Sequence, residues 1–366
     1  MVVRREASGA ASTLPEGDGP EHARPMPGLV DVHSHAIPPG LPAQRSSVGG
    51  GRWPTVERSR DQAAVVVAGR VFRTIDSRCW SPSRRIDDLD AAGVDVQVVS
   101  PIPVTFCYDA APSDALALAR AQNDFLAEFV RGGEGRFRAL GGVPLQDPET
   151  AVTELRRCVA ELGFPGVEIG TTVAGRDLAD PAFDDFFSAA DELDALLLVH
   201  PGALPEADAA RLAPLGLGFG VGMPCETAVA AAQLIVGGVL SARPRLKVCL
   251  AHGGGALPML LGRLDRGYDV LPGMAARLHE RPSVVARRLW ADSLTYDPQT
   301  LALTLARFGN DHVVVGTDYP FAAQETPGAT IRAARAAGYC DEATYRAVAA
   351  GNAATLLGTR AYEEVR

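Results

Sequence analysis

The sequence predicts a closed barrel of eight parallel strands, the (β/α)8 or TIM-type fold, with a small insertion after the first strand. Eight short apolar runs alternate with helical patterns, which favours a parallel α/β architecture over a sandwich or a helical bundle. The chain has 366 residues, of which 47% are hydrophobic, so it is long enough for one barrel with insertions. An open doubly wound sheet competes with the barrel, because counting strands does not show whether the sheet closes.

The strands are expected where apolar runs end in glycine, proline or another turn residue. They span residues 29–35, 94–103, 137–144, 166–171, 195–202, 246–253, 289–296 and 312–321. Helical patterns lie between them at residues 113–130, 148–162, 181–193, 226–241, 298–308 and 329–337. The second and third of these helices carry proline in their first turn, where the missing N–H costs no helical hydrogen bond.

The connection between the first two strands, residues 36–93, is far longer than a usual βα loop. It opens with prolines and glycines and then carries an apolar run, AAVVVAGRVFR, that is typical of a small hairpin. Because it follows the carboxyl end of a barrel strand, we expect it to overhang the barrel mouth as a lid that reads the substrate. Residues 1–27 are expected to form a mobile tail, and residues 28–366 a single barrel domain.

The composition limits the class of partner. The net charge of −9 is spread along the chain without a basic run, which argues against nucleic acid or an anionic membrane surface as a partner. The six cysteines form no CxxC pair, as is usual for a reduced cytoplasmic protein. We find no apolar stretch close to the roughly 20 residues of a membrane span. We therefore expect a cytoplasmic enzyme that acts on a small molecule.

Four side chains that commonly bind metals lie at predicted strand ends: His33 and His35 in LVDVHSH, His200 in LLLVHPG, and Asp318 in VVVGTDYPF. Residues i and i+2 of a strand share a face, so His33 and His35 can point at one ion. Nitrogen and carboxylate donors without thiolate suit zinc first, with manganese, iron or cobalt possible. The HxH pair alone is weak evidence, because solvated imidazoles at a strand end are the commoner explanation. All four residues together require neighbouring first and last strands, which favours a closed barrel.

A further histidine, His252 in VCLAHGGG, ends the sixth predicted strand. A catalytic metal keeps one position open for water or substrate, so we expect this imidazole to transfer protons rather than to complete the metal's ligands. Its ordinary pKa near neutrality suits that role. A role as a fifth ligand, or as a hydrogen-bond partner of the ligands, remains open.

Several dispersed motifs match a known family. They are DVHSH, VFR, RIDDLDAAGVDVQVVSPIPV, LLVHP, MPCET, AHGGGALPMLLGRLD and VGTDYPF. Through them the chain resembles the amidohydrolase superfamily, in its branch of metal-dependent nonoxidative decarboxylases, from about residue 29 to residue 357. The resemblance implies a barrel, zinc bound by the three histidines and the aspartate named above, and a His252 that activates the metal-bound water.

The resemblance also implies roles for two arginines. Arg73 in VFR matches an arginine that holds the substrate carboxylate, which a planar guanidinium binds through two hydrogen bonds. Arg263 in LLGRLD matches an arginine that reaches the active site of the neighbouring subunit, which implies a homodimer as the catalytic unit. Gly202 stands where related decarboxylases have an aromatic residue, and Arg70 lies one place from a second basic position. The pocket is therefore expected to differ in shape.

The expected function is metal-dependent nonoxidative decarboxylation of a small unsaturated or aromatic carboxylic acid. The zinc-activated water and the histidine proton shuttle implied by the resemblance would equally serve a hydrolase that acts on an amide, a lactone or a related bond. A third possibility is a metal-binding barrel without catalysis. Its signature would be the loss of a ligand or of His252, and neither is lost.

Overall fold

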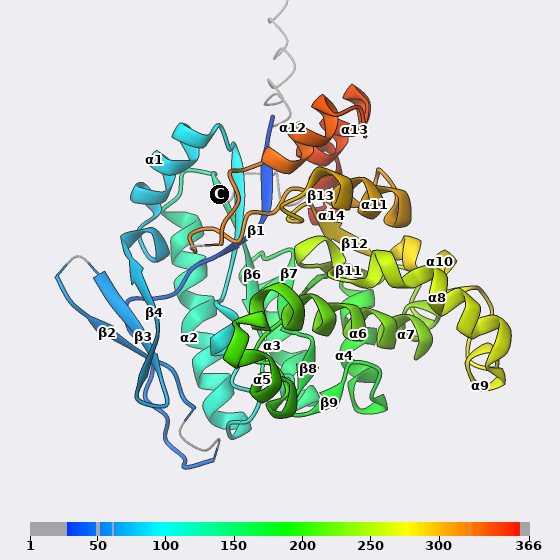
Figure 1. Ribbon diagram of the computed structural model, residues 1–366. Helices are drawn as coiled ribbons and strands as arrows, with labels where there is room; N and C mark the ends of the chain where they lie inside the picture. The colour runs from blue at the N-terminus through cyan, green and yellow to red at the C-terminus, as the bar shows by residue number, and fades with distance from the viewer. Residues whose placement is uncertain (1–27, 49–51, 61, 322, 359–366) are drawn as a thin grey trace, which may run out of the picture.

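The structure, a computed structural model, describes residues 28–48, 52–60, 62–321 and 323–358; the predicted tail, residues 1–27, lies outside them. Eight strands form one sheet in the order β1-β5-β6-β7-β10-β11-β12-β13, and neighbours are parallel (Figure 1). They are β1 (Val30–His35), β5 (Val96–Ser100), β6 (Phe137–Gly142), β7 (Gly166–Gly170), β10 (Leu196–His200), β11 (Lys247–Leu250), β12 (Trp290–Asp292) and β13 (Val313–Val314). Two isolated bridges, Asp31 to Val315 and Ser34 to Tyr319, join the last strand to the first. The closed barrel is confirmed, and the open sheet was the wrong alternative.

Helices surround the barrel. The longer ones are α1 (Pro82–Ala92), α2 (Pro112–Arg131), α3 (Pro148–Ala160), α4 (Asp184–Glu192), α6 (Met223–Val236), α8 (Leu257–Val270), α11 (Pro298–Phe308) and α12 (Ala329–Ala336). The shorter ones are α5 (Glu206–Leu212), α7 (Val239–Ala242), α9 (Pro272–Ala275), α10 (Pro282–Val285), α13 (Glu342–Arg346) and α14 (Asn352–Leu357). Asp147 and Asp297 cap α3 and α11, each accepting a hydrogen bond from the N–H three residues on. The helix predicted at 226–241 is two helices, because Gly238 adopts a positive φ of 80° between them.

One helical run corrects the expectation about membrane spans. The run Gly218–Val236, a π-helical turn (Gly218–Gly222) followed by α6, has 19 residues and a mean hydropathy of 1.4. By length and composition it could cross a membrane, so the expectation that no stretch comes close was wrong. Its hydropathy comes mainly from valine, isoleucine, leucine and phenylalanine, and the side chains buried on α6 include Ala228, Ala230 and Ala231. In the structure α6 packs beside α7 and α8 in the wall of the barrel.

The insertion after β1 forms a small antiparallel sheet of β2 (Thr55–Arg58), β3 (Gln62–Val67) and β4 (Arg70–Asp76). The predicted hairpin is confirmed as β3 and β4, joined by Ala68 and Gly69, both with positive φ, as a two-residue hairpin turn requires. β2 adds a third strand that the sequence did not reveal. The end of the range 36–93 is α1. In Figure 1 this sheet projects from one flank of the barrel, opposite α8 and α9.

A buried arginine fastens the insertion to β1. Arg85 on α1 is completely buried, and its guanidinium donates hydrogen bonds to the carbonyl oxygens of His35 (2.6 Å) and Arg78 (2.8 Å). Arg78 lies just beyond the end of β4, and His35 ends β1. One guanidinium therefore holds together the last residue of the first barrel strand and the return of the insertion.

Side chains alternate between the barrel interior and the helical shell, as strand geometry requires. Leu196 and Leu198 belong to the interior cluster, whereas Leu197 and Val199 pack in the larger cluster with residues of the helices. His200, at the end of the same strand, therefore points inward. On β1 the register against β5 shifts between Asp31 and Ser34. This irregularity lets both Val32, in the interior cluster, and the histidines that follow face the barrel axis.

Candidate metal centre

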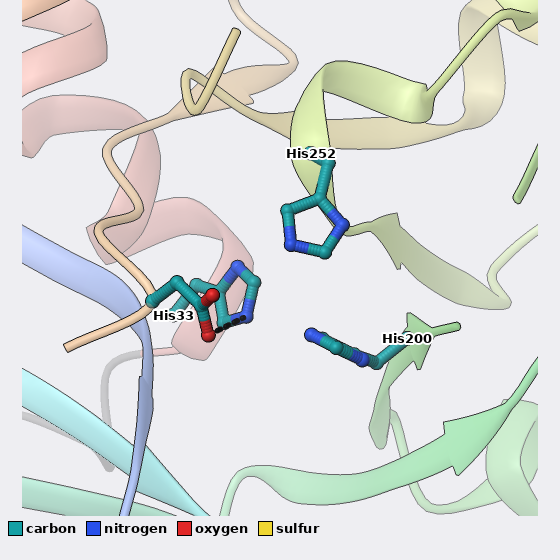
Figure 2. Close-up of side chains that lie close together, drawn as sticks. His33, His200 and His252 are labelled. Atoms are coloured by element: carbon teal, nitrogen blue, oxygen red, sulfur yellow. Dashed lines mark ion pairs between the residues drawn. The ribbon is translucent and has the colours of Figure 1, made fainter. Parts of the chain in front are cut away.

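The four predicted ligands converge at the carboxyl ends of the strands. His33 and His35 come from β1, His200 from the last position of β10, and Asp318 from the segment after β13. The Nε2 atoms of His33 and His35 lie 3.3 Å apart, and Oδ1 of Asp318 lies 3.1 Å from Nε2 of His35 and 3.9 Å from Nε2 of His33. The ring of His200 is centred 5.0 Å from that of His33. Figure 2 shows His33, His200 and His252 pointing toward one another from separate elements.

Each of the three histidines makes a hydrogen bond on the side away from this centre. Nδ1 of His33 meets a carboxylate oxygen of Asp292 at 2.6 Å, and Nδ1 of His35 and of His200 meet the carbonyl oxygens of Pro101 and Pro201, each at 2.8 Å. A carbonyl can only accept, so Nδ1 of His35 and of His200 carries the proton and Nε2 offers a lone pair. This is the arrangement by which proteins orient histidine ligands to a metal.

The residues present fit a divalent ion. Nε2 of His200 is buried and has no hydrogen-bond partner among the described residues, although an unpaired buried polar atom is costly. Ligand atoms from His33, His200, His252 and Asp318 all lie within 4.8 Å of one another. Imidazole nitrogens with one carboxylate are a donor set for zinc and for other first-row divalent ions.

The pKa values of the three histidines are shifted in different directions. Burial lowers the pKa of His35, and it lowers the pKa of His200 well below the usual value. For His33 burial acts in the same direction, but the hydrogen bond and charge of Asp292 outweigh it and raise its pKa to about 9. The pKa of Asp318 falls below its usual range despite burial, because His35 lies against it. In the metal-free protein at neutral pH, the histidine that carries a proton to be displaced is therefore His33.

The sequence analysis did not predict Asp292, whose carboxylate forms hydrogen bonds with two parts of the metal centre. This last residue of β12 accepts hydrogen bonds from the ring of His33 and from the backbone N–H groups of His252 (2.9 Å), Gly253 (2.8 Å) and Leu294 (3.0 Å). It thereby fixes one ligand and the turn that carries His252. The available signal was a carboxylate inside a predicted apolar strand, where a charged side chain needs partners.

The backbone is shaped to bring these groups together. Asp318 and His252 have positive φ values of 59° and 57°, which side-chain-bearing residues rarely adopt outside constrained sites. Gly316 lies where β13 passes β1, and a Cβ there would come within 2.9 Å of Cβ of His33 and 2.8 Å of Cβ of Asp292. Only glycine allows so close an approach of the last strand to the first.

His252 lies over the ligands, with ring centres 4.9 Å from His200 and 5.3 Å from His33. Burial lowers its pKa, so the imidazole is neutral at neutral pH and able to accept a proton. Its nitrogen is close enough to the other ligand atoms to bind the same ion. The geometry thus keeps both roles open, proton transfer and ligation.

The centre forms the floor of a cavity of about 1040 Å³. His35, His200, His252 and Asp318 line it, and Arg73 lines its wall. Aromatic rings make up much of the remaining wall: Phe72, Phe106, Tyr108, Phe219 and Phe321.

Two predicted features of the cavity wall can be placed. The guanidinium carbon of Arg73, on β4, lies 3.8 Å from the ring centre of Phe321, and burial lowers the pKa of this arginine. The insertion therefore brings a cation to the cavity, as expected. Gly202 also lines the cavity, and a Cβ there would meet only Phe106, at 3.9 Å. The space that an aromatic residue would fill is open.

Arg263 is the predicted site residue that the structure does not bring to the cavity. It lies exposed on α8, outside the lining residues. In Figure 1 that helix is on the flank opposite the sheet that carries Arg73. Within one chain, the two arginines therefore do not meet.

A second carboxylate that the sequence did not single out lies in the barrel interior. Glu168 on β7 is completely buried, and neither of its oxygens has a hydrogen-bond partner among the described residues. Burial raises its pKa to about 8. It stands in an apolar strand, GVEIG, so the signal that would have found it is the same as for Asp292.

Comparisons with known proteins agree with this geometry. A model of the Amidohydrolase family matches residues 30–359. A 2-amino-3-carboxymuconate-6-semialdehyde decarboxylase of Dictyostelium discoideum is 38% identical over 90% of this chain and 91% of its own length. A gamma-resorcylate decarboxylase of Rhizobium radiobacter is 29% identical over 81% of this chain and 89% of its own.

Solved structures add the fold and the bound groups of a relative. The 5-carboxyvanillate decarboxylase of Novosphingobium aromaticivorans, in complex with manganese and 4-hydroxy-3-methoxy-5-nitrobenzoic acid, is 28% identical. It superimposes with a TM-score of 0.67 and covers 75% of this chain and 79% of its own. That relative holds a divalent metal together with an aromatic carboxylate.

Proposed function

This chain belongs to the Amidohydrolase family, in its decarboxylase branch, and from that premise we propose that it removes carbon dioxide from a small unsaturated or aromatic carboxylic acid. The proposal is carried by one observation. Three imidazoles whose Nδ1 atoms are engaged elsewhere turn Nε2 toward one carboxylate on the floor of a cavity that also holds a guanidinium. The relatives named above act on conjugated or aromatic acids by their names, and the aromatic wall of this cavity suits such a substrate.

His33, His35, His200 and Asp318 would hold the divalent ion. When bound, it supplies a Lewis acid that polarises an oxygen of the substrate or of water. Zinc is our first choice for this donor set, and manganese, which a relative binds, is the main alternative, with iron and cobalt next.

The protein's own residues supply position and protons. Decarboxylation breaks the bond between a substrate carbon and its carboxylate and leaves the electron pair on that carbon, which must take up one proton. His252 is placed to hold that proton on an imidazole nitrogen and to deliver it, because it lines the cavity beside the proposed ligands. Arg73 would hold the carboxylate in the cavity until the bond breaks.

We further propose a homodimer in which Arg263 of one subunit completes the cavity of the other. Its support is the position of Arg263, exposed and away from its own cavity, together with the motif in which it lies. A rim arginine from a second subunit would put another cation at the mouth of a site built for a carboxylate.

The experiment is to incubate the protein, loaded with zinc or manganese, with 2,6-dihydroxybenzoate, 5-carboxyvanillate and 2-amino-3-carboxymuconate semialdehyde, and to measure carbon dioxide and product mass. We expect loss of carbon dioxide from at least one acid. Asp318→Asn should abolish the reaction together with metal binding, whereas His279→Gln, a change at an exposed histidine outside the cavity, should leave both intact. A product heavier by one water, without carbon dioxide, would instead identify a hydrolase.

A further inference from the structure

Glu168 is a buried acid that the proposed chemistry does not use. It lies in the middle of β7, where its neighbours Val167 and Ile169 pack outward against the helices. By the alternation of a strand, Glu168 points into the barrel. It is completely buried and absent from the residues that line the cavity.

The groups around Glu168 stabilise its charge only in part: the charge of His33 and the hydroxyl of Ser100 lower its pKa, but burial outweighs both. Neither oxygen has a hydrogen bond of ordinary geometry among the described residues, and Nδ1 of His35 lies 4.0 Å from Oε1. That nitrogen already donates to the carbonyl of Pro101. Buried carboxyl groups are ordinarily paired, hydrogen-bonded or bound to a metal.

Another buried acid shows the contacts that a carboxylate with a structural role makes in this protein. Glu154 on α3 is also completely buried, and it receives hydrogen bonds from Arg120 (2.8 Å), Asn123 (2.9 Å) and Arg157 (2.8 Å). Each of its oxygens is satisfied. Glu168 lacks any such arrangement, which points to a partner that is not a side chain.

The position of Glu168 identifies that partner. One ligand atom each from His35, Glu168 and His200 lies within 4.8 Å of the others. His200 also belongs to the group formed with His33, His252 and Asp318. Glu168 is thus adjacent to two of the proposed ligands, His35 and His200, and it is absent from the residues that line the cavity.

We propose that Glu168 is a second carboxylate of the metal centre, which faces the divalent ion from the buried side and stabilises it by its negative charge. The inference rests on the metal centre of the proposed function and adds a residue to it. An additional carboxylate favours oxygen-preferring ions, so Glu168 raises affinity for manganese more than affinity for zinc. The centre would then have two acidic groups, Asp318 and Glu168.

The test is metal affinity, which needs no substrate. The chelated wild-type protein and Glu168→Gln are titrated with manganese, and the free ion is measured by its electron paramagnetic resonance. We expect Glu168→Gln to bind manganese about 10- to 100-fold more weakly, the usual effect of removing a group that supports a metal site, with a smaller loss for zinc. Glu154→Gln is the matched control: it removes a buried carboxylate away from the centre and should leave both affinities unchanged.

Thermal unfolding without metal separates this role from a structural one. Glu168→Gln should then melt at or above the wild-type temperature, because it removes an unpaired buried acid, whereas Glu154→Gln should melt lower. Equal manganese affinity in Glu168→Gln and the wild type would overturn the inference while leaving the proposed function intact. A wild type that binds no divalent ion would overturn both. Should Glu168→Gln not fold, Glu168→Asp withdraws the carboxyl by one methylene, and unchanged affinity there would count equally against it.

Discussion

Each of three imidazoles in the candidate metal centre is held by an acceptor on the side away from the proposed ion. Two of these acceptors are backbone carbonyls, of Pro101 and Pro201, and the third is the carboxylate of Asp292. The difference has a chemical consequence. A carboxylate stabilises imidazolium far more than a carbonyl does, so His33 alone has its pKa raised, to about 9.

This difference predicts how many protons the metal displaces. At pH 7 the metal-free protein carries a proton on His33 that must leave before Nε2 can bind, whereas His35 and His200 are already neutral. Glu168, whose pKa of about 8 keeps it protonated at pH 7, must also lose its proton to face the ion as a carboxylate. Binding of zinc or manganese should therefore release about two protons at pH 7, one from His33 and one from Glu168, and none well above pH 9. Apparent affinity should rise with pH up to about 9 and then level off. Calorimetry in buffers of different ionisation enthalpy measures the number; release of no proton, or of three or more, at pH 7 would contradict it.

A second prediction distinguishes the two roles of His252. Glutamine keeps the size of the side chain but cannot transfer a proton at neutral pH, so His252→Gln should retain one ion per chain and lose on the order of 10² to 10⁴-fold in kcat. Metal analysis and steady-state kinetics on the same sample provide the measurement, with His279→Gln as the control histidine. Loss of the ion along with activity would make His252 a ligand.

The sequence predicts most of the residues that form the metal centre, but it does not predict the groups that form hydrogen bonds with them. The HxH pair, His200, His252 and Asp318 each end an apolar run, and parallel strand ends share one mouth. The hydrogen-bond acceptors of the Nδ1 atoms of the three histidines could not be predicted from the sequence, because two of them are main-chain carbonyls, which every residue possesses. Asp292 and Glu168 were not predicted, because the sequence alone does not show that a single acid within an apolar strand lies inside the barrel beside the histidines.

At the scale of elements, the insertion sheet has the clearest functional consequence. It stands beside the barrel and carries Arg73 on β4 to the wall of the cavity. Arg85 holds the end of the insertion to the end of β1 by donating hydrogen bonds to the carbonyl oxygens of Arg78 and His35. The position of Arg73 therefore depends on an element that is not part of the barrel.

Arg73→Met should chiefly weaken substrate binding. Hydrogen bonds to a charged group contribute about 1.5–3 kcal/mol, so KM should rise roughly 10- to 150-fold, with a smaller change in kcat, while metal content stays the same. Arg70→Met is the control, because Arg70 is exposed on the same strand and does not line the cavity. Steady-state kinetics decide the matter; equal KM values for the two variants would remove Arg73 from substrate binding.

Elements were predictable where pattern alone determines them. All eight strands follow from apolar runs, and the start of α3 follows from the proline in its first turn. β2 was not predictable, because Thr55–Arg58 is mostly exposed and is held only by pairing with β3. The strand expected at 312–321 is only two residues long in β13, because the chain leaves the sheet beyond Val314 to place Asp318 at the centre.

At the scale of the whole molecule, α8 presents a surface that one chain does not use. Met259 is 74% exposed and Leu260 41% exposed on this helix, close in sequence to Arg263. Exposed apolar side chains beside a charged group are typical of a contact with another protein. This surface is consistent with the proposed homodimer.

Subunit mixing tests whether Arg263 acts across that dimer. His252→Gln and Arg263→Met should each be nearly inactive alone. In a mixed dimer, a trans-acting Arg263 leaves one site with both lesions and the other with neither, so activity should return to about half of that expected for two intact sites. Tag capture verifies that subunits exchange. If mixed dimers form and activity stays at the level of the parents, Arg263 does not act in trans.

The closure of the barrel gives the ion a further effect, on the motion of the chain. The last strand and the segment after it meet β1 through two isolated bridges, at Asp31 and Ser34, and a few hydrogen bonds, and the proposed ligands come from both sides of this seam. A bound ion is thus a removable cross-link between the first and last strands, which restricts opening there as a covalent bridge would. Hydrogen exchange should slow on metal binding at the amides of Val32 and His35, which bond to Val315 and Tyr319 across the seam, but not at that of Leu196, which bonds to Pro165. The catalytic ion would then help to keep the barrel closed, and after loss of the ion the barrel would open first where the last strand meets the first.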